Sequence, residues 1–445
     1  MKMKLKSLKI EALFNTFSYD LHFDSQNKYL ILTGINGYGK TTILNMISAL
    51  ATKDLYYFYT VPFASIDFGF EDGAVLSLSS DRVENAASAD VPVRGGRRLL
   101  FDMKESDGKS IGMFSIDAAT IARVMKTNYH FSHISINNRR LKEDYESTEF
   151  YQTMKDEGLL NAIMQLSGKN ADQMMMRLDA FIASYIEAER TVECRYLRPK
   201  NMAPDLEYRD PKWYLIDHLA SDFRYMLNNE YANFVNYSQK VDADFINKAV
   251  SSSLVYEQNT FDAEREKLIV RARELELLGL IPHTDVKPYD EANAKMLTAY
   301  IVAQNEKLDF YNTLLSKIHL FYKLVEERGF VNKNMSVTVK DGFRFRAEGN
   351  GFIDLSLLSS GEQNEVVMLY TLVFSVQDNS MLLIDEPENS LHVLWQKKFM
   401  RTIEEVSALK NLFAIVATHS PQIIGTRWDN CCDLTELMGG GNDGE

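Results

Sequence analysis

A glycine-rich run between an apolar strand and a helical segment is the feature that most constrains the fold of this chain. The run Gly34-Ile35-Asn36-Gly37-Tyr38-Gly39-Lys40-Thr41-Thr42 matches the G-x-x-x-x-G-K-[ST] phosphate loop at every defined position. The residues before it, Tyr29 to Leu32, read as a short buried strand, and Thr42 to Leu50 read as a helix with an apolar face. This order of strand, loop and helix argues against a chance match, so the sequence predicts a nucleoside-triphosphate site.

The residue types in the loop suit phosphate binding. Glycines let the backbone wrap closely round a triphosphate with its N–H groups pointing inward. Lys40 can then reach the β- and γ-phosphates, and the Thr41 hydroxyl can hold Mg²⁺. The residues predicted to bind the phosphates are Gly34, Asn36, Gly37, Gly39, Lys40, Thr41 and Thr42.

A second motif, an apolar strand that ends in two acids, lies far downstream at Met381-Leu382-Leu383-Ile384-Asp385-Glu386-Pro387. An acid at the C-terminal end of a strand can hold Mg²⁺, which is the role predicted for Asp385. The next carboxylate, Glu386, could orient and deprotonate the attacking water. The pattern is weak alone and becomes strong beside a phosphate loop.

A third pattern, Leu358-Ser359-Ser360-Gly361-Glu362-Gln363, precedes a helical stretch from Asn364 to Val376. Small residues at a helix start favour an anion site, because unpaired N–H groups and the helix dipole face outward there. Since the first loop already holds the chain's own phosphates, this helix start indicates that Ser359, Ser360 and Gly361 reach the nucleotide of another subunit. An ordinary N-cap is the alternative interpretation.

In this order the three motifs resemble those of the ABC ATPase family, particularly its soluble SMC-like branch. The resemblance implies an α/β fold, an ABC-type P-loop ATPase head of two lobes, in which residues 358–363 form the signature motif. It covers roughly the first 50 and the last 110 residues of the chain.

The resemblance also implies roles for individual residues. Glu386 is expected to be the catalytic base, and His419, after the strand-like run Leu412 to Ala417, the switch histidine that contacts the γ-phosphate. Asn389-Ser390-Leu391-His392 corresponds to the D-loop. ATP and Mg²⁺ are the implied substrate and cofactor. Candidates by position for the family's Q-loop glutamine are Gln152 and Gln165.

Composition narrows the function classes. No apolar run approaches the roughly 18 to 20 residues that a bilayer-spanning helix needs, which excludes a transporter with its own membrane domain. Cys194, Cys431 and Cys432 form neither a C-x-x-C pair nor an even set, which fits a reducing cytoplasmic environment rather than a disulfide or metal framework.

The formal net charge of −13 argues against a broad nucleic-acid surface. Three basic clusters read as solvated faces or loops, although they could form a local patch for an acidic ligand. They contain Arg94, Arg97 and Arg98; Arg139, Arg140 and Lys142; and Arg195, Arg198 and Lys200.

The pattern along the chain predicts three parts: an ATPase lobe over residues 1–145, a helical insertion over 146–330 and a second lobe over 331–445. One stretch in the insertion is expected to be helical from Ala171 to Ala188. The expected strands outside the motifs are Lys4–Leu13, Tyr19–Phe23, Val75–Leu78, Leu99–Met103, Ile111–Ile116, Ser336–Val339 and Phe343–Arg346.

A second helical stretch in the insertion carries apolar residues at alternating spacings of four and three, without a break. This 3.5-residue repeat is the spacing of a coiled-coil seam, with one polar layer at Gln304. A buried helix of a compact bundle is the rival interpretation, because Leu314, Phe321 and Leu324 broaden the apolar face. The repeat runs through Leu297, Ile301, Gln304, Leu308, Tyr311, Leu315, Ile318, Tyr322 and Val325.

Two function classes remain open. The first is an ATP-gated scaffold or sensor that holds and releases a separate effector; the second is an SMC-like ATPase that acts directly on nucleic acid in repair or recombination. The short insertion, the lack of a C-x-x-C at its tip and the acidic charge favour the first. The overcoming-lysogenisation-defect family carries a Toprim nuclease after a similar ATPase, whereas about 26 residues follow His419 here, so any nuclease is expected to be a partner.

A chain of this size and motif style also resembles the ATPase subunits of two-gene anti-phage defence systems, the AriA family of PARIS first and the PtuA family of Septu next. That resemblance implies a homo-oligomer joined through ATP-sandwiched heads and able to form larger assemblies. It also implies an AriB-like Toprim nuclease as effector and a phage protein as trigger.

Overall fold

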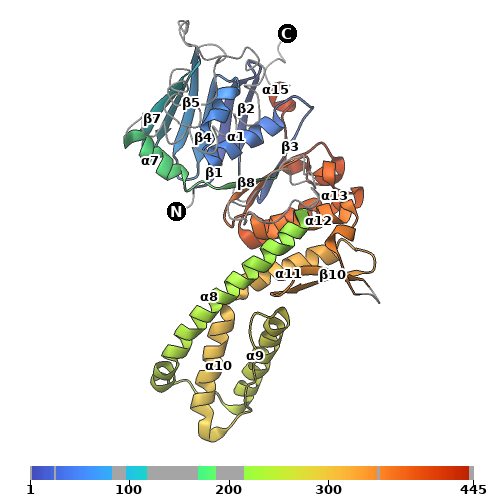
Figure 1. The fold of residues 1–445 in the computed structure, drawn as a ribbon. Helices are drawn as coiled ribbons and strands as arrows, with labels where there is room; N and C mark the ends of the chain where they lie inside the picture. Colours follow the sequence, from blue (N-terminus) through green and yellow to red (C-terminus); the bar gives the residue numbers. More distant parts are fainter. Residues whose placement is uncertain are drawn as a thin grey trace, which may run out of the picture. The chain divides into compact units, whose positions relative to one another are not determined.

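The computed structural model describes residues 3–24, 27–82, 97–117, 169–186, 215–347 and 351–439. The chain divides into two compact units, one formed by residues 1–189 together with 376–445 and the other by residues 190–375. The first unit therefore joins the two distant ends of the sequence (Figure 1).

An antiparallel sheet of six strands forms one layer of the first unit, in the order β2-β1-β4-β5-β6-β7. Buried and exposed residues alternate along β1 and β6, as expected for a sheet with one face on the core. Every strand expected in this region is present, and β4 is an additional one. The strands are β1 (Leu5–Leu13), β2 (Phe17–His22), β4 (Ser65–Phe70), β5 (Val75–Arg82), β6 (Arg97–Lys104) and β7 (Ser110–Asp117).

A parallel sheet of five strands forms the second layer, in the order β14-β3-β13-β12-β8. All five residues of β12 are buried, which is typical of a parallel strand covered on both faces. The phosphate-loop strand β3 pairs with β13, and β13 pairs with the strand that ends at Asp385. The strands are β3 (Tyr29–Thr33), β8 (Ala183–Ile186), β12 (Met381–Asp385), β13 (Phe413–Ala417) and β14 (Cys431–Asp433).

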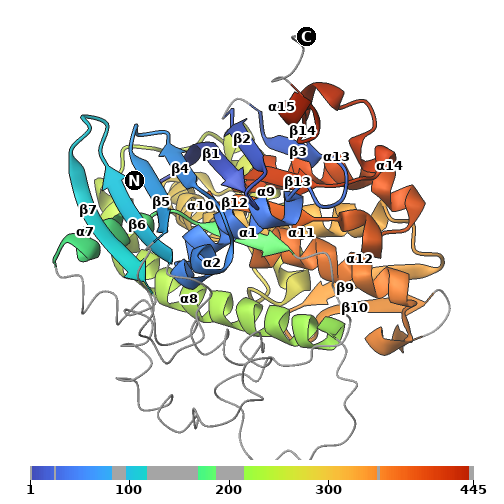
Figure 2. The same ribbon diagram turned by 90° about the horizontal axis from the view of Figure 1, so that it is seen from above.

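Helix α1 (Lys40–Thr52) packs against β8, β12 and β13, and its buried side chains join both sheets in one hydrophobic core. Ile43, Leu44 and Ile47 are fully buried in that core. Figure 2 shows α1 and α2 beside the strands of the first unit. The other helices of this unit are α2 (Leu55–Thr60), α7 (Lys169–Leu178), α13 (Val393–Lys410), α14 (Pro421–Ile424) and α15 (Glu436–Gly439).

The predicted helix from Ala171 to Ala188 is wrong beyond its first half. Helix α7 ends at Leu178, and Ala183–Ile186 form β8, which pairs in parallel with β12. A short apolar run such as Phe181 to Ile186 fits a strand or a helix equally well by periodicity. Pairing with the edge of β12 makes this run a strand, and the sequence pattern alone does not show that contact.

The second unit consists of helices and a three-stranded antiparallel sheet in the order β11-β10-β9. Helix α10 packs against α8 and α9, while α8 also packs against β10 and α12 (Figure 1). In the part of the chain that the structure describes, no helix is both long and apolar enough to cross a membrane. The elements are α8 (Leu215–Ser251), α9 (Gln258–Leu278), α10 (Ala294–Asp309), α11 (Asn312–Glu326), β9 (Lys333–Thr338), β10 (Gly342–Ala347), β11 (Phe352–Ile353), α12 (Ser360–Tyr370) and the π-helical turn η4 (Thr371–Ser375).

The stretch with the 3.5-residue repeat is two helices rather than one. Helix α10 ends at Asp309, and α11 begins at Asn312. The fully buried Tyr311 lies at this break, where its hydroxyl donates to the Leu280 carbonyl oxygen at 3.0 Å and its ring packs on Phe234. The unbroken coiled coil is therefore wrong: α10 packs against α8 and α9, whereas α11 packs against α12, β9 and η4.

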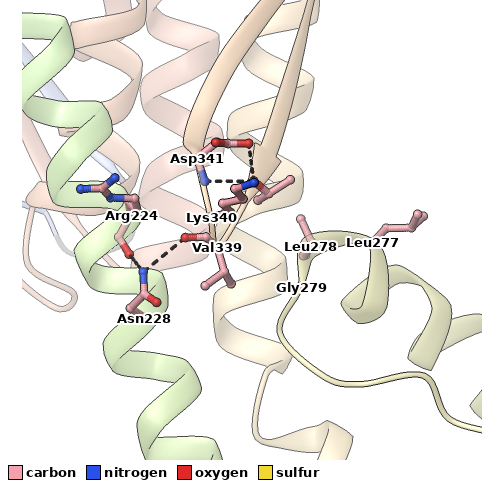
Figure 3. A pocket seen from close by; sticks show the side chains of 9 residues that line it. Arg224, Asn228, Leu277, Leu278, Gly279, Val339, Lys340 and Asp341 are labelled. Atoms are coloured by element: carbon pink, nitrogen blue, oxygen red, sulfur yellow. Dashed lines mark hydrogen bonds between the residues drawn. The ribbon is translucent and has the colours of Figure 1, made fainter.

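The turn between β9 and β10 lies against α8 and the end of α9. The Val339 N–H donates to the Leu278 carbonyl oxygen at 2.8 Å, and the Asn228 amide donates to the Val339 carbonyl oxygen at 3.3 Å. A cavity of about 630 Å³ opens beside these contacts (Figure 3). Gly342 ends the turn with a φ of +70°, and a Cβ there would meet the Ala220 carbonyl oxygen at 2.4 Å.

The substitution Gly342→Ala should therefore destabilise the second unit. A positive φ costs an alanine about 1 kcal/mol, and overlap with the α8 backbone should bring the loss to about 2 to 4 kcal/mol of unfolding free energy. The matched control is Gly329→Ala, since Gly329 also has a positive φ but open space around it. Equal melting temperatures of the two variants in calorimetry would contradict the packing of this turn.

Candidate functional site

The phosphate loop has the backbone that its glycines predict. Gly34, Gly37 and Gly39 all have positive φ angles, of 137°, 91° and 89°. Gly39 caps α1, so the helix begins at Lys40 and its first N–H groups face the loop. The side chain of Asn36 is exposed in the loop, and Thr42 lies in the first turn of α1. The loop therefore forms an anion-binding concavity at a helix N-terminus.

Lys40 is 94% buried and is held by acceptors from both ends of the chain. Its Nζ donates to the Gly34 carbonyl oxygen at 2.9 Å and lies 2.5 Å from Nε2 of His419. Because an ammonium group can only donate, this contact requires a neutral imidazole that accepts at Nε2. Burial lowers the pKa of Lys40 from its usual value, while nearby carboxylates, Glu386 first, oppose that shift.

Asp385 lies beside the loop at the end of β12. Its Oδ2 accepts from the Thr41 hydroxyl at 2.8 Å and from the Tyr185 hydroxyl at 3.4 Å. Its Oδ1 is buried and has no hydrogen-bond partner among the described residues. Burial raises the pKa of this carboxyl above its usual value, although the bond from Thr41 opposes the rise.

These donors fit Mg²⁺. A buried carboxylate oxygen without a partner costs free energy unless a cation or a proton donor reaches it. Among the described residues, no group of three or more His, Cys, Asp and Glu side chains could hold a metal ion by itself. The usual magnesium site of a nucleotide enzyme takes one or two protein oxygens together with water and substrate phosphates. Thr41 and Asp385 are the residues that would hold the ion.

Glu386 has an uncommon backbone. Its φ of 39° and ψ of 57° lie in the left-handed region, which costs a non-glycine residue about 1 to 3 kcal/mol. The Glu386 N–H donates to the Ala417 carbonyl oxygen at 2.9 Å, and the Asn389 amide donates to the Glu386 Oε2 at 2.8 Å. The backbone of Glu386 is therefore held by β13, and its side chain is held by the predicted D-loop.

The predicted D-loop lies in the 3₁₀ turn η5 (Pro387–Ser390) and the start of α13. Leu391 is buried, whereas His392 caps α13 by accepting from the Leu394 N–H at 3.3 Å through Nδ1. Sequence reasoning missed Glu388 in this segment, whose Oε1 accepts from the Thr418 hydroxyl and from the His419 N–H, each at 2.8 Å. Its only signal was a third acid close to Asp385 and Glu386.

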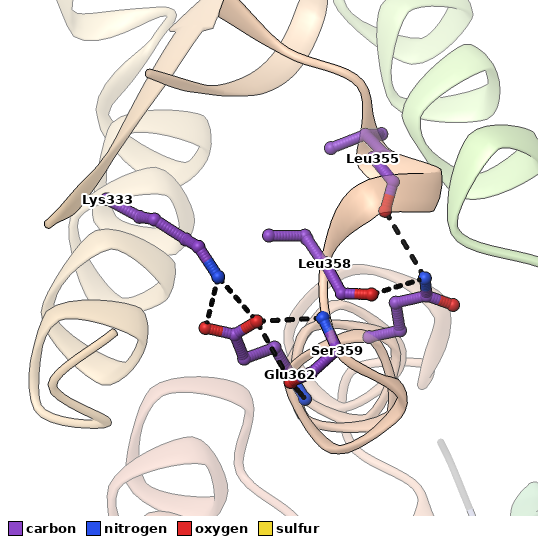
Figure 4. A network of polar contacts seen from close by, with 6 residues as sticks. Lys333, Leu355, Leu358, Ser359 and Glu362 are labelled. Carbon is purple, nitrogen blue, oxygen red and sulfur yellow. Dashed lines mark hydrogen bonds and ion pairs between the residues drawn. The ribbon is translucent and has the colours of Figure 1, made fainter. Parts of the chain in front are cut away.

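The signature residues lie in the second unit, at the start of α12. Ser359 is the N-cap and forms a capping box with Glu362, so the N-cap interpretation holds for its side chain. Both Glu362 oxygens accept from Nζ of Lys333, at 2.6 Å each (Figure 4). Burial raises the pKa of Glu362, but the hydrogen bonds from Lys333 and Ser359 lower it more, so the pKa lies below its usual value.

A buried ion pair also anchors this helix. Nε of Arg328, just after α11, lies 2.8 Å from Oε2 of Glu365, and both side chains are almost fully buried. Ser360 is exposed, and Gly361 follows it in the first turn. That Ser359, Ser360 and Gly361 contact a nucleotide of another subunit stays a prediction.

Some predicted residues have other surroundings or lie outside the described residues. Arg97 points to backbone carbonyls of Tyr59, Val61 and Phe63 and stacks over the Phe63 ring, so it belongs to the packing of the first unit. Arg98 donates to the Ser115 hydroxyl. The residues outside the described ranges are Gln152, Gln165, Cys194, Arg94, Arg139, Arg140, Lys142, Arg195, Arg198 and Lys200.

Comparison with known proteins places this site in a family. The family model described as AAA ATPase domain matches residues 3–424. A stretch of 67 residues is 37% identical to Protein ea59 of Escherichia phage lambda, a match that spans 15% of this chain and 13% of that protein.

Solved structures of SMC heads are also similar to this chain. The Smc head domain of Pyrococcus furiosus with an extended coiled coil, bound to the C-terminal domain of ScpA, has a TM-score of 0.37 and 13% identity over 97% of this chain and 93% of its own. The SMC head domain of Thermotoga maritima has a TM-score of 0.32 and 10% identity over 95% and 91%.

The loop geometry predicts that Lys40→Ala strongly weakens ATP binding, because a buried charge-assisted contact to phosphate is lost. Equilibrium binding of fluorescent ATP measures the effect, with Lys9→Ala as the control, since Lys9 forms an exposed ion pair with Glu11 on β1. Unchanged affinity in a folded Lys40→Ala protein would show that the loop does not hold the phosphates.

Proposed function

The chain belongs to the AAA ATPase domain family and is a P-loop ATPase, and from this premise we propose that it is an ABC-type ATPase that holds ATP between two copies and thereby controls a separate effector. The single observation that carries the ATPase part concerns Asp385, whose Oδ2 accepts from Thr41 next to Lys40 while its buried Oδ1 has no hydrogen-bond partner among the described residues. An acid so placed at a phosphate loop is the usual metal-binding acid of nucleotide hydrolysis.

Each residue of the site has a task in the proposed reaction. Lys40 exchanges its contacts with Gly34 and His419 for the β- and γ-phosphates of the substrate. Glu386, held by Asn389, accepts the proton of the attacking water. Mg²⁺, bound by Thr41 and Asp385, would supply neutralisation of phosphate charge.

The start of α12 is evidence for an ATP site that a second copy of the chain completes. Ser359 uses its side chain for the capping box, which leaves the exposed Ser360 side chain and the first-turn N–H groups to meet an anion. Lys333 and Arg328 hold this helix start in place through Glu362 and Glu365. A γ-phosphate bridging two copies would then join them, and its hydrolysis would release them.

An exposed apolar surface of the second unit is evidence that it binds a partner protein. Exposed apolar side chains gather where α8 ends, along the following loop and at the start of α10, and we name them the apolar patch. The Lys295 ammonium donates to the Val250 carbonyl oxygen and the Tyr256 N–H to the Thr298 hydroxyl, so the three segments are in contact. Patches of this kind mark protein–protein interaction sites. The apolar patch consists of Ile246, Val250, Leu254, Val255 and Met296, each 48 to 72% exposed.

The resemblance to two-gene anti-phage systems gives the proposed partner its class. The effector is a Toprim nuclease of the AriB type, which the ATPase holds until a phage protein is sensed. Hydrolysis exposes a different surface of the assembly and so changes whether the effector is held.

Glu386→Gln keeps the shape and hydrogen bonding of the side chain but removes the proton acceptor. We expect ATP turnover to fall by about 100-fold or more while ATP still binds. Size-exclusion chromatography with light scattering should show a dimer with ATP and Mg²⁺ that persists longer than for the unmodified protein. Glu405→Gln, which changes the acid of an ion pair with Arg401 on α13, is the control. Normal turnover in Glu386→Gln would remove Glu386 from the role of base.

The effector is identified by purifying the tagged chain from its native host and analysing the co-purifying proteins by mass spectrometry. We expect a nuclease that remains bound to the unmodified protein and is lost from Val250→Glu, because a charge enters the apolar patch. Val270→Glu, at a comparably exposed valine of α9, should retain it. The purified ATPase alone should cut neither DNA nor RNA. Repair proteins in place of a nuclease, or equal retention by both variants, would contradict the scaffold.

A further inference from the structure

Glu388 is a carboxylate of the site to which the proposed reaction gives no task. It lies in η5, three residues after Asp385, and its Oε1 accepts two hydrogen bonds of 2.8 Å. One comes from the hydroxyl of the fully buried Thr418, and the other comes from the backbone N–H of His419. Both donors belong to the segment that follows β13.

Gln396 of α13 forms further hydrogen bonds to the same segment. Its Oε1 accepts from the Ser420 hydroxyl at 2.8 Å, and its Nε2 donates to the carbonyl oxygens of Glu388 and Leu391 at 3.3 and 3.1 Å. The Ser420 N–H donates to the Thr418 hydroxyl at 3.0 Å. Residues 418–420 are therefore connected on both sides of His419 to the segment that begins at Glu388.

The imidazole of His419 has fewer restraints than its backbone. The residue is exposed, and among the described residues its ring forms a hydrogen bond with Nζ of Lys40 through Nε2. The position of the ring relative to the phosphate loop is thus set mainly by where the backbone N–H of His419 is fixed. A charged acceptor at that N–H fixes it more strongly than a neutral one.

We infer that Glu388 is a positioning residue that holds the backbone of His419 and thereby sets the His419 imidazole on Lys40 at the phosphate loop. The inference rests on the proposed ATP hydrolysis. Glu388 acts as a hydrogen-bond acceptor and takes no proton from water. Because it lies beside Asn389, which holds Glu386, one short turn positions both the base and the histidine.

The kinetic test compares Glu388→Ala with Glu388→Gln. Glu388→Ala removes the acceptor, and misplacement of the histidine should lower kcat for ATP by about 10- to 100-fold with little change in KM. Glu388→Gln keeps an acceptor oxygen at the same place and should restore most of kcat. Thr418→Val, which removes one of the two donors to Oε1, should fall between them. A Glu388→Gln protein as slow as Glu388→Ala would overturn the inference.

A double-mutant cycle separates positioning from a general loss of structure. If Glu388 acts through His419, then Glu388→Ala should lower kcat by less than about twofold in a His419→Ala background, since coupled residues are not additive. If the two losses multiply, Glu388 acts independently of the histidine and the inference is wrong. Glu404→Ala, at the ion pair between α13 and Arg427, is the control for a lost carboxylate.

The position of the His419 imidazole can be measured by NMR without ATP turnover, so this test does not depend on the proposed hydrolysis. The chain has 8 histidines, and the imidazole resonance of His419 is the one that disappears in His419→Ala. We expect that resonance to shift in nucleotide-free Glu388→Ala and to stay in place in Glu388→Gln. An unshifted resonance would overturn the inference even if ATP hydrolysis is confirmed, whereas a shift in a protein that fails to hydrolyse ATP would refute only the proposed function.

Discussion

The parallel pairing of β3 with β13 and of β13 with β12 is the constraint on which the rest of the site depends. It brings Lys40 and His419, 379 positions apart in the sequence, to within a hydrogen bond, and it places Asp385 beside Thr41. These strands end at the same edge of the sheet, so their C-terminal residues meet where ligands of open α/β sheets bind. A change in this pairing would separate the phosphate loop from every acid that serves it.

Two buried polar groups of the site, on Lys40 and Asp385, could bind a ligand. Lys40 is buried with its ammonium shared between a carbonyl and an imidazole, and one oxygen of Asp385 is buried with no partner among the described residues. Both groups would gain from a phosphate and a cation, because buried polar atoms without full hydrogen bonding are costly. The strained backbone of Glu386 is a further cost that a functional position can carry.

Sequence reasoning located the residues of the phosphate loop, Asp385 and Glu386, because each follows from local chemistry at a fixed spacing. It failed where tertiary contacts decide. The run that forms β8 became a strand only through its pairing with β12, and the break between α10 and α11 depends on where Tyr311 is buried. Tyr185, Lys333 and Glu388 belong to no spacing pattern, so only the fold reveals that they contact Asp385, Glu362 and His419.

The central claim is that two copies complete each other's ATP sites, and subunit mixing tests it most directly. Ser360→Trp should block approach of α12 to the opposite nucleotide while its own phosphate loop stays intact, and Lys40→Ala has the opposite defect. Each variant alone should be inactive, whereas an equal mixture should recover part of the ATPase activity, because one site of a mixed dimer keeps two good halves. Ser316→Trp, on the exposed face of α11, is the control that should stay active alone. A mixture that remains inactive although mixed dimers form, or an active Ser360→Trp protein, would contradict the account.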